Sequence, residues 1–527
     1  MESVPGVRQV RPILPLWAAV LVAVAAGFIL DLAYPSVGWW PLAFLGVGLS
    51  LVALVGRSLW GSALVGFVFG ITFYLIHIVW LNRYLGVIPW FALAGAATIY
   101  VTLGSVLITL AYRWMPRAWP GRWPQLIATP LLIAALWTLR EFVTGSWPYS
   151  GFPWARVAMS QSESPLAHLT SWVGISGLSF LMVAFTAMLI EWLRARGWRD
   201  LRTAAPFAAL GVILLLVPQF PTTPAGTFTV GSVQGNGPSG YFDPRARNDV
   251  LNAQVLASSE LFGDEMDLML WPEGGIDSDP TANSTTAQVL DAVSDAAGAP
   301  LLVNAATERD GLIFNTSMLW IGGEGVQQYH DKAHPVPFGE YVPDRWFYEL
   351  LVPDLVGLIQ REYAPGTNQP YVEVDGVGIG LAICFDVIYD DVIEAGARDG
   401  AQVYMFQTNN ADFRGTDENL QQLAFARMRA IETGRSVVNI STVGTSQVIA
   451  PDGTTIDALP ADTAGAMLTE VPLRTGLTPA MLVGTVITNV IVLAGLVGLI
   501  AAGIFARATS RRDEAPASGG EVGASSG

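Results

Sequence analysis

The sequence predicts a membrane protein in which an α/β domain lies between seven membrane spans and an eighth. Its 527 residues are 52% hydrophobic and 14% charged, with a mean hydropathy of +0.43, which is too apolar for an ordinary soluble protein. Apolar stretches that could cross a hydrocarbon core of roughly 30 Å recur along the chain. From Thr227 onward, short β-like runs replace them until the last apolar stretch.

Eight apolar stretches are candidate spans: 13–32, 41–55, 61–81, 88–112, 126–139, 169–190, 205–217 and 481–505. The second, fifth and seventh are short, so the charge of the loops serves as an independent check of the count. A cleaved signal peptide is the alternative for the first stretch. Its apolar run is long, however, and more spans follow it directly, which favours a span.

The distribution of arginine predicts the orientation of these spans. With the N-terminus in the cytoplasm, the inside segments carry thirteen arginines, whereas the short outside loops carry Arg83, Arg140 and Arg156. Cytoplasmic loops are enriched in Lys and Arg. We therefore expect a bundle at 1–218, an extracytoplasmic domain at 219–479, an eighth span at 480–506 and a disordered cytoplasmic tail at 507–527.

Charge and cysteine content exclude several classes of function. The net charge is −16, and the segment 219–479 is strongly acidic while the rest of the chain is net positive. Such a surface does not resemble one that binds nucleic acid, so we expect no nucleic-acid partner. One cysteine permits no intrachain disulfide and no cysteine cluster for a metal. We expect neither a metal nor a cofactor.

The extracytoplasmic segment is expected to be an α/β domain of about 260 residues, large enough for its own core. One helix is clear, with Thr416 as its cap, an apolar face from Leu420 to Ile431 and Gly434 at its end. The expected strands are 227–234, 267–271, 300–305, 315–321, 377–383, 403–408, 437–440 and 447–450.

Three residues of this domain form a chemical set. Cys384 is the one cysteine and Lys332 the one lysine of the chain, although Lys and Arg together number 28. Cys384 follows an expected strand, Lys332 lies in a segment rich in proline and glycine, and Glu273 closes the run after another strand. A glutamate can take the thiol proton, the thiolate can attack a carbonyl, and the ammonium can hold the oxyanion.

Each of the three residues also has a plainer interpretation. A lone cysteine is often a small buried hydrophobic residue, Glu273 could be a surface acid, and Lys332 could be an exposed cation. Their occurrence after separate strands favours the catalytic interpretation.

The flanking motifs resemble a known family. The order Glu, Lys, Cys is similar to the nitrilase superfamily, whose fold is an αββα sandwich. The segment 332–343, Lys-Ala-His-Pro-Val-Pro-Phe-Gly-Glu-Tyr-Val-Pro, together with seven preceding spans and one following span, resembles the apolipoprotein N-acyltransferase family. The motifs at 151–154 and 174–180 agree, so the resemblance covers nearly the whole chain.

This resemblance implies roles for four residues. Glu273 would be the general base, Lys332 the oxyanion stabiliser, Cys384 the nucleophile, and Glu340 a second glutamate that orients the lysine. The acyl donor would be a phospholipid and the acceptor the N-terminal amine of a diacylated apolipoprotein, in the last step of lipoprotein maturation. The enzyme would be a monomer in the bacterial inner membrane.

The chain departs from the family pattern at two places. Many members have Cys-Tyr-Glu where this chain has Cys384, Phe385 and Asp386, and Asn-Asp-Ala-Trp at the segment 409–412, where this chain has Asn-Asn-Ala-Asp. These departures leave the three catalytic candidates in place. They leave open what Phe385, Asp386 and Asp412 do.

Two other functions stay open beside the acyltransferase. A membrane-tethered amidase would resolve the same acyl-enzyme with water, although eight spans are excessive for a tether. A lipid-binding scaffold would need no catalysis, although a decayed site would not be expected to retain the sole lysine and the sole cysteine. The apolar stretch 346–359 could be a lid that touches lipid or a core helix. His334 is expected to have a structural hydrogen-bonding role rather than to act as a base.

Overall fold

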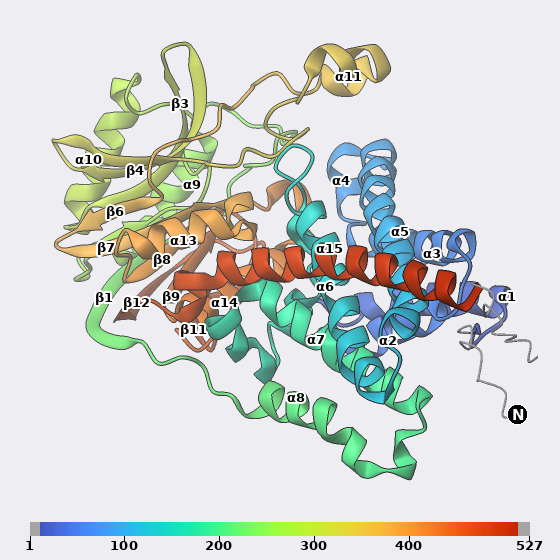
Figure 1. Ribbon diagram of the computed structural model, residues 1–527. Helices are drawn as coiled ribbons and strands as arrows, with labels where there is room; N and C mark the ends of the chain where they lie inside the picture. The colour runs from blue at the N-terminus through green and yellow to red at the C-terminus, as the bar shows by residue number, and fades with distance from the viewer. Residues whose placement is uncertain (1–10, 515–527) are drawn as a thin grey trace, which may run out of the picture.

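The computed structural model describes residues 11–514 and shows an α/β sandwich joined to a bundle of apolar helices (Figure 1). Within this part of the chain, five helices are long and apolar enough to cross a membrane, and three shorter apolar helices occupy other predicted stretches. The five are α3 (Leu59–His77), α5 (Val87–Ala118), α6 (Thr129–Thr144) with the turn before it, α7 (Thr170–Arg194) and α15 (Pro479–Glu514), and the shorter three are α1 (Leu16–Asp31), α2 (Leu42–Leu54) and α8 (Ala205–Leu216).

Small residues let the helices of the bundle approach closely. A methyl group at Gly66 of α3 would lie 2.5 Å from the Ser105 hydroxyl of α5, and one at Gly46 of α2 would lie 2.9 Å from the Leu30 side chain of α1. Both spacings are too short for a side chain. Packing of this kind is how apolar helices associate where lipid is the solvent.

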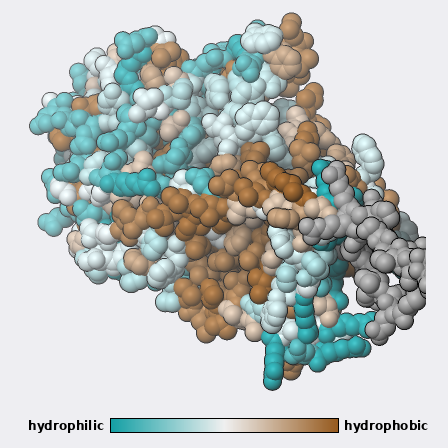
Figure 2. Space-filling model, in the orientation of Figure 1, coloured by the Kyte–Doolittle hydropathy of each residue, from teal (hydrophilic) through white to brown (hydrophobic). Residues whose placement is uncertain are grey.

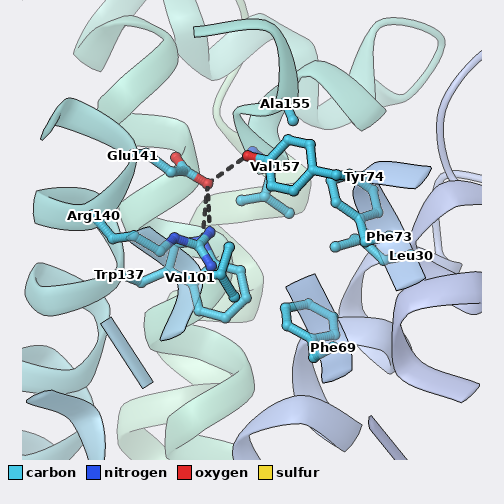
Figure 3. Close-up of a pocket in the computed structure, with 10 residues that line it drawn as sticks. All are labelled: Leu30, Phe69, Phe73, Tyr74, Val101, Trp137, Arg140, Glu141, Ala155 and Val157. Atoms are coloured by element: carbon cyan, nitrogen blue, oxygen red, sulfur yellow. Dashed lines mark hydrogen bonds and ion pairs between the residues drawn. The ribbon is translucent and has the colours of Figure 1, made fainter. Parts of the chain in front are cut away.

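Two predictions about the bundle need correction. Arg140 was assigned to an outside loop, but α6 continues to Thr144 and holds Arg140 inside the bundle. Its guanidinium lies 4.0 Å from the centre of the Trp137 ring and 3.6 Å from the Glu141 carboxylate (Figure 3). An arginine whose charge is paired in this way says little about the sidedness of a loop.

The second correction concerns the C-terminal tail. Helix α15 continues beyond residue 506 to Glu514, so the prediction of disorder from residue 507 is wrong for 507–514. Arginine at 507, 511 and 512 is compatible with a helix because arginine is a good helix former. The remainder of the predicted tail, 515–527, lies outside the described residues.

The segment predicted to be an α/β domain folds into two six-stranded sheets. The first has the order β12 (Gly465–Thr475), β1 (Thr223–Gln234), β2 (Leu268–Leu270), β3 (Leu301–Arg309), β4 (Leu312–Ile321) and β5 (Gly325–Asp331). The second has the order β11 (Thr455–Leu459), β10 (Ser446–Ile449), β9 (Ser436–Ser441), β8 (Val403–Thr408), β7 (Val377–Ile383) and β6 (Tyr371–Val374). This arrangement confirms the predicted two-sheet, nitrilase-like fold.

Helices cover the outer faces of the two sheets. The sheets share a core that includes Leu270, Leu381 and Met405, all buried. Helices α9 (Asp249–Ser258) and α10 (Ser284–Ala297) pack on the first sheet around Trp271. Helices α13 (Asp390–Arg398) and α14 (Glu418–Thr433) lie on the second sheet, and their apolar side chains belong to one continuous core with the membrane bundle. The α13 and α14 layer therefore packs on both parts of the protein.

Polar contacts fix the sandwich on the bundle. The side-chain oxygen of Gln421, in α14, accepts hydrogen bonds from the indoles of Trp154 at 2.6 Å and Trp80 at 3.1 Å. Arg156 binds the Asp390 carboxylate at the start of α13, with a shortest distance of 2.8 Å. These contacts hold α13 and α14, and with them the residues after β7, at a fixed place above the bundle.

The hydropathy of the surface differs between the bundle and the sandwich. In Figure 2 the exposed face of α15 and of the helices beneath it is hydrophobic, whereas most of the sandwich is hydrophilic. A further hydrophobic patch lies over α11 (Arg345–Leu351), at the top of the view. Helix α11 and the short helix α12 (Pro353–Val356) belong to the stretch between the lysine loop and the cysteine strand.

Candidate active site

The ends of three strands bring Glu273, Lys332 and Cys384 together. Glu273 follows β2 and Lys332 follows β5 in the first sheet, while Cys384 follows β7 in the second. The site therefore lies where the two sheets face each other at one end of the sandwich. Side chains after strand ends are free of the sheet's hydrogen bonds and can point at a common centre.

Lys332 lies at the middle of this cluster. Its side chain is 1% exposed, and its ammonium nitrogen lies 3.2 Å from the Glu273 carboxylate and 2.9 Å from that of Glu340. Burial alone would lower the pKa of this lysine. The two carboxylates outweigh burial and raise the pKa of Lys332 well above its usual value. The lysine is therefore a permanent buried cation.

Asn315, which is not among the predicted site residues, joins the two glutamates. Its side-chain nitrogen donates to Glu273 at 2.8 Å and to Glu340 at 3.1 Å. Its oxygen accepts from Asn304 at 2.8 Å. A buried asparagine inside an expected strand is a signal that could have identified it, because such a polar group needs partners.

Glu273 is a buried carboxylate with a raised pKa. Burial, and after it the charge of Glu340, raise the pKa of Glu273, while Lys332 opposes the rise. A carboxylate with a raised pKa accepts a proton more readily. Its hydrogen bond from Asn315 and its ion pair with Lys332 hold the carboxylate in one position.

Cys384 lies at a sharp turn between β7 and the short 3₁₀ helix Cys384–Ile388. Its φ of 50° is rare for a residue with a side chain, and such strain gathers at functional sites. Burial, and then the nearby Glu273 carboxylate, raise the pKa of the thiol well above its usual value, while Lys332 opposes the rise. The resting thiol is therefore neutral and needs a base to become a nucleophile.

The residues after the cysteine have structural partners. The Asp386 carboxylate is fully buried and accepts hydrogen bonds from the backbone of His334 at 2.9 Å and of Ala333 at 3.3 Å. It thereby ties the lysine loop to the turn that carries Cys384. Burial raises the pKa of Asp386 to about 6. Phe385 stacks on Phe152 of the bundle, with ring centres 6.4 Å apart.

His334 lies beside the cluster and turns away from it. Its Nε2 is 2.9 Å from the Asp391 carboxylate, and its ring stacks on Tyr389. The same residue offers its backbone N–H to Asp386. These contacts agree with the predicted structural role.

The stretch 346–359 is exposed in its first half and packed in its second, so it fits neither the lid nor the core-helix interpretation as a whole. Trp346 is 71% exposed and Leu350 77% exposed, whereas Val356 and Ile359 are buried in a small core of their own. The hydroxyl of Tyr241 holds the end of the stretch by donating to the Leu358 carbonyl at 2.6 Å, and the backbone N–H of Tyr241 donates to Asp412 at 2.9 Å. Asp412 thus has a structural contact next to the site.

Two family models match consecutive parts of the chain. Residues 26–189 match the apolipoprotein N-acyltransferase N-terminal domain, and residues 229–476 match the carbon-nitrogen hydrolase domain. An amidase of the nitrilase superfamily from Nesterenkonia aligns with 48% of this chain and 94% of its own, at a TM-score of 0.37 and 17% identity.

Two curated relatives match most of the chain. The apolipoprotein N-acyltransferase of Mycolicibacterium smegmatis is 31% identical over 97% of this chain and 90% of its own, and that of Azotobacter vinelandii is 30% identical over 88% and 91%. The two domain matches follow each other in the order that the sequence predicted. The chain belongs to the apolipoprotein N-acyltransferase family.

Proposed function

We propose that this protein is a membrane acyltransferase that moves an acyl chain from a phospholipid to the N-terminal amine of a diacylated apolipoprotein. The observation that carries the proposal is the buried cluster in which the sole lysine is paired with two glutamates beside the sole cysteine. Family membership supports the choice of substrates, because relatives that match almost the whole chain are named for this reaction.

In the first half-reaction, Glu273 removes the thiol proton of Cys384, and the thiolate attacks the ester carbonyl of the phospholipid. Lys332 compensates the negative charge that develops on the carbonyl oxygen. When the ester bond breaks, the departing glycerol oxygen takes the proton from Glu273 and leaves as a lysophospholipid. Cys384 then carries the acyl chain as a thioester, and Glu273 is again a carboxylate.

In the second half-reaction, the neutral amine of the acceptor attacks the thioester carbonyl. Glu273 takes a proton from the attacking nitrogen, the carbon–sulfur bond breaks, and the same proton returns to the departing thiolate. The products are an amide and the free thiol. Lys332 faces the carbonyl oxygen in both halves, so one arrangement of charges serves two tetrahedral intermediates.

The exposed half of the stretch 346–359 supports a lipid substrate. Helix α11 presents Trp346 and Leu350 to the outside, next to the loop that carries Lys332. Large exposed apolar side chains on an otherwise hydrophilic domain mark a contact with lipid or protein. Contact of this helix with the membrane would let an acyl chain approach Cys384 while water is kept from the thioester.

For membrane topology, we propose eight spans with the sandwich outside the cytoplasmic membrane and both termini inside. A reporter fused after Val471 is expected to be extracytoplasmic, and one fused after Arg512 cytoplasmic, because the arginine-rich segments lie on the opposite side from the sandwich. Paired alkaline phosphatase and fluorescent protein fusions measure this. Two fusions active on the same side would contradict the eight-span arrangement.

The fate of the thioester distinguishes the acyltransferase from the amidase. We expect the acyl-enzyme to persist in water and to disappear when a diacylated lipopeptide with a free N-terminal amine is added. The measurement is the mass of the intact protein over time after addition of phospholipid, with and without lipopeptide, and the mass of the released product.

An N-acetylated lipopeptide is the matched control, because it keeps both acyl chains but lacks the nucleophilic amine. Steady release of fatty acid or ammonia without any lipopeptide would favour the amidase. A protein that never gains acyl mass would favour the scaffold.

A further inference from the structure

A row of buried polar side chains lies beside Cys384, where α14 begins. Gln422 of α14 is 3% exposed, and its side-chain nitrogen donates to the sulfur of Cys384 at 3.4 Å. Glu418, one turn earlier, is also 3% exposed. Neither residue has a part in the mechanism described above, and buried polar groups of this kind need a reason.

Asn410 connects these two side chains. Its side-chain nitrogen donates one hydrogen to the Gln422 oxygen and the other to the Glu418 carboxylate, each at 2.8 Å. Its oxygen accepts from the Ser441 hydroxyl at 2.7 Å. With its oxygen occupied by Asn410, the Gln422 amide can present only its N–H groups to Cys384.

A backbone group also contacts the serine at the start of this chain of hydrogen bonds. The N–H of Gly444 donates to the Ser441 oxygen at 2.9 Å. The Ser441 hydroxyl has one hydrogen of its own, which it donates to the Asn410 oxygen, and Asn410 in turn donates to Gln422. In this arrangement the Gln422 amide turns its N–H groups toward Cys384.

Close packing keeps the chain in place. A methyl group on Gly444 would lie 2.4 Å from the Asn410 oxygen and 2.9 Å from the Ser441 oxygen. Both distances are shorter than a carbon atom tolerates, so glycine is required here for Asn410 to reach its position. Gly444, Ser441, Asn410 and Gln422 thus form one series of hydrogen bonds that ends at the sulfur of Cys384.

We propose that Gln422 is a further catalytic residue, whose amide donates a hydrogen bond to the thiolate of Cys384. Asn410 and Ser441 are positioning residues that hold this amide in the donating orientation. The thiolate exists twice in the reaction, once as the attacking group and once as the departing group, and a fixed donor stabilises it both times. This inference rests on the proposed function only in taking Cys384 as the nucleophile.

Glu418 completes the arrangement without adding charge. The charged groups that face Cys384 are Glu273 after β2, Lys332 after β5 and Glu418 at the start of α14. Burial raises the pKa of Glu418 to about 8. At neutral pH this carboxyl is mostly protonated, so it can accept from Asn410 while it places little negative charge beside the thiolate.

The sole cysteine makes the test direct, because alkylation by iodoacetamide reports on Cys384 alone. In the detergent-solubilised full chain, Gln422→Leu is expected to move the pH midpoint of alkylation up by about one unit, and to slow alkylation about tenfold below that midpoint, since a hydrogen bond to a charged group is lost. Acyl-enzyme formation from phospholipid is expected to slow by a similar factor.

Asn410→Ala is expected to produce part of this shift, and to add nothing once Gln422 is already leucine, because it acts through Gln422. Thr445→Val is the matched control. This substitution removes a hydrogen bond of 3.2 Å between the loop after β9 and Asn419 of α14. Thr445 is not part of the series of hydrogen bonds that leads to Cys384, so the alkylation midpoint should stay unchanged.

An unchanged alkylation midpoint in Gln422→Leu would overturn the inference, even if the melting temperature falls, because a purely structural role lowers stability alone. Full additivity of Asn410→Ala and Gln422→Leu would overturn the positioning role of Asn410. Alkylation requires no acyl transfer, so these outcomes are separate from failure of the proposed function. That failure would appear as a protein with Cys384 intact that gains no acyl mass from phospholipid, or that releases fatty acid without any lipopeptide.

Discussion

Cys384→Ala is expected to abolish both acyl-enzyme formation and N-acylation. The thiol is the only one in the chain, so no neighbouring cysteine can replace it, and water held at the site would be a far weaker nucleophile than a thiolate. Intact-protein mass after incubation with phospholipid should show one added acyl chain in the native protein and none in the variant. Cys384→Ser should behave in the same way, because Glu273 must then remove a far less acidic proton.

The variant is expected to fold, because the loss of one sulfur atom costs little beside the core. Its melting temperature should therefore stay close to that of the native protein, which serves as the control for misfolding. Acyl transfer by a well-folded Cys384→Ala protein at the native rate would remove the covalent mechanism altogether.

Glu273→Gln is expected to slow acyl-enzyme formation by on the order of 10²-fold or more, because it removes the proton acceptor and keeps the shape of the side chain. Lys332 retains its contact with Glu340 at 2.9 Å, so the variant does not leave a buried ammonium without a partner. The measurement is the single-turnover rate of acylation, followed by protein mass.

Glu340→Gln is the comparison for charge. It removes one negative charge from the same cluster but leaves Glu273 free to act as base, so it should slow acylation less. Equal losses in the two variants would mean that the cluster acts through its total charge. A native rate of acylation in Glu273→Gln would assign the base to another group.

The sheets show which strands a sequence reveals. The strands found in advance include β7 and β8, whose continuous apolar runs are buried on both faces, and both were predicted with their observed ends. The strands that were missed are β5, β6, β11 and β12, which are the four edges of the two sheets. An edge strand has a neighbouring strand on one side only, and its other side is open to solvent. Its sequence is therefore alternating or polar and resembles that of a loop.

The candidate site shows the same limit. Glu273, Lys332 and Cys384 could be named because rare residue types follow recognisable strands. Gln422 could not, because an amide on a helix is chemically ordinary and gains importance only through the atoms it contacts. Three-dimensional pairing, which brings Gln422 of α14 to the end of β7, is the information that the chain order lacks.

One departure from the family pattern, Asn410, can be related to its hydrogen bonds. At position 410, where many members have aspartate, this chain has an asparagine that donates two hydrogen bonds. An aspartate could donate neither. Asn410, Glu418 and Gln422 therefore form a matched set, in which a change at one position alters what the other two require.

The helical layer of α13 and α14 has a consequence for how the enzyme can be divided. In an αββα sandwich that stands alone, the outer face of such a layer meets water or another subunit, whereas here it is continuous with the core of the bundle. The catalytic domain and the membrane bundle thus share one hydrophobic core. Removing the bundle would expose the apolar side chains of α13 and α14, so the sandwich is not expected to be a soluble enzyme on its own. Helix α14, which contacts Cys384 through Gln422, also packs on the bundle. The membrane part therefore helps to position the catalytic residues and does more than tether the domain.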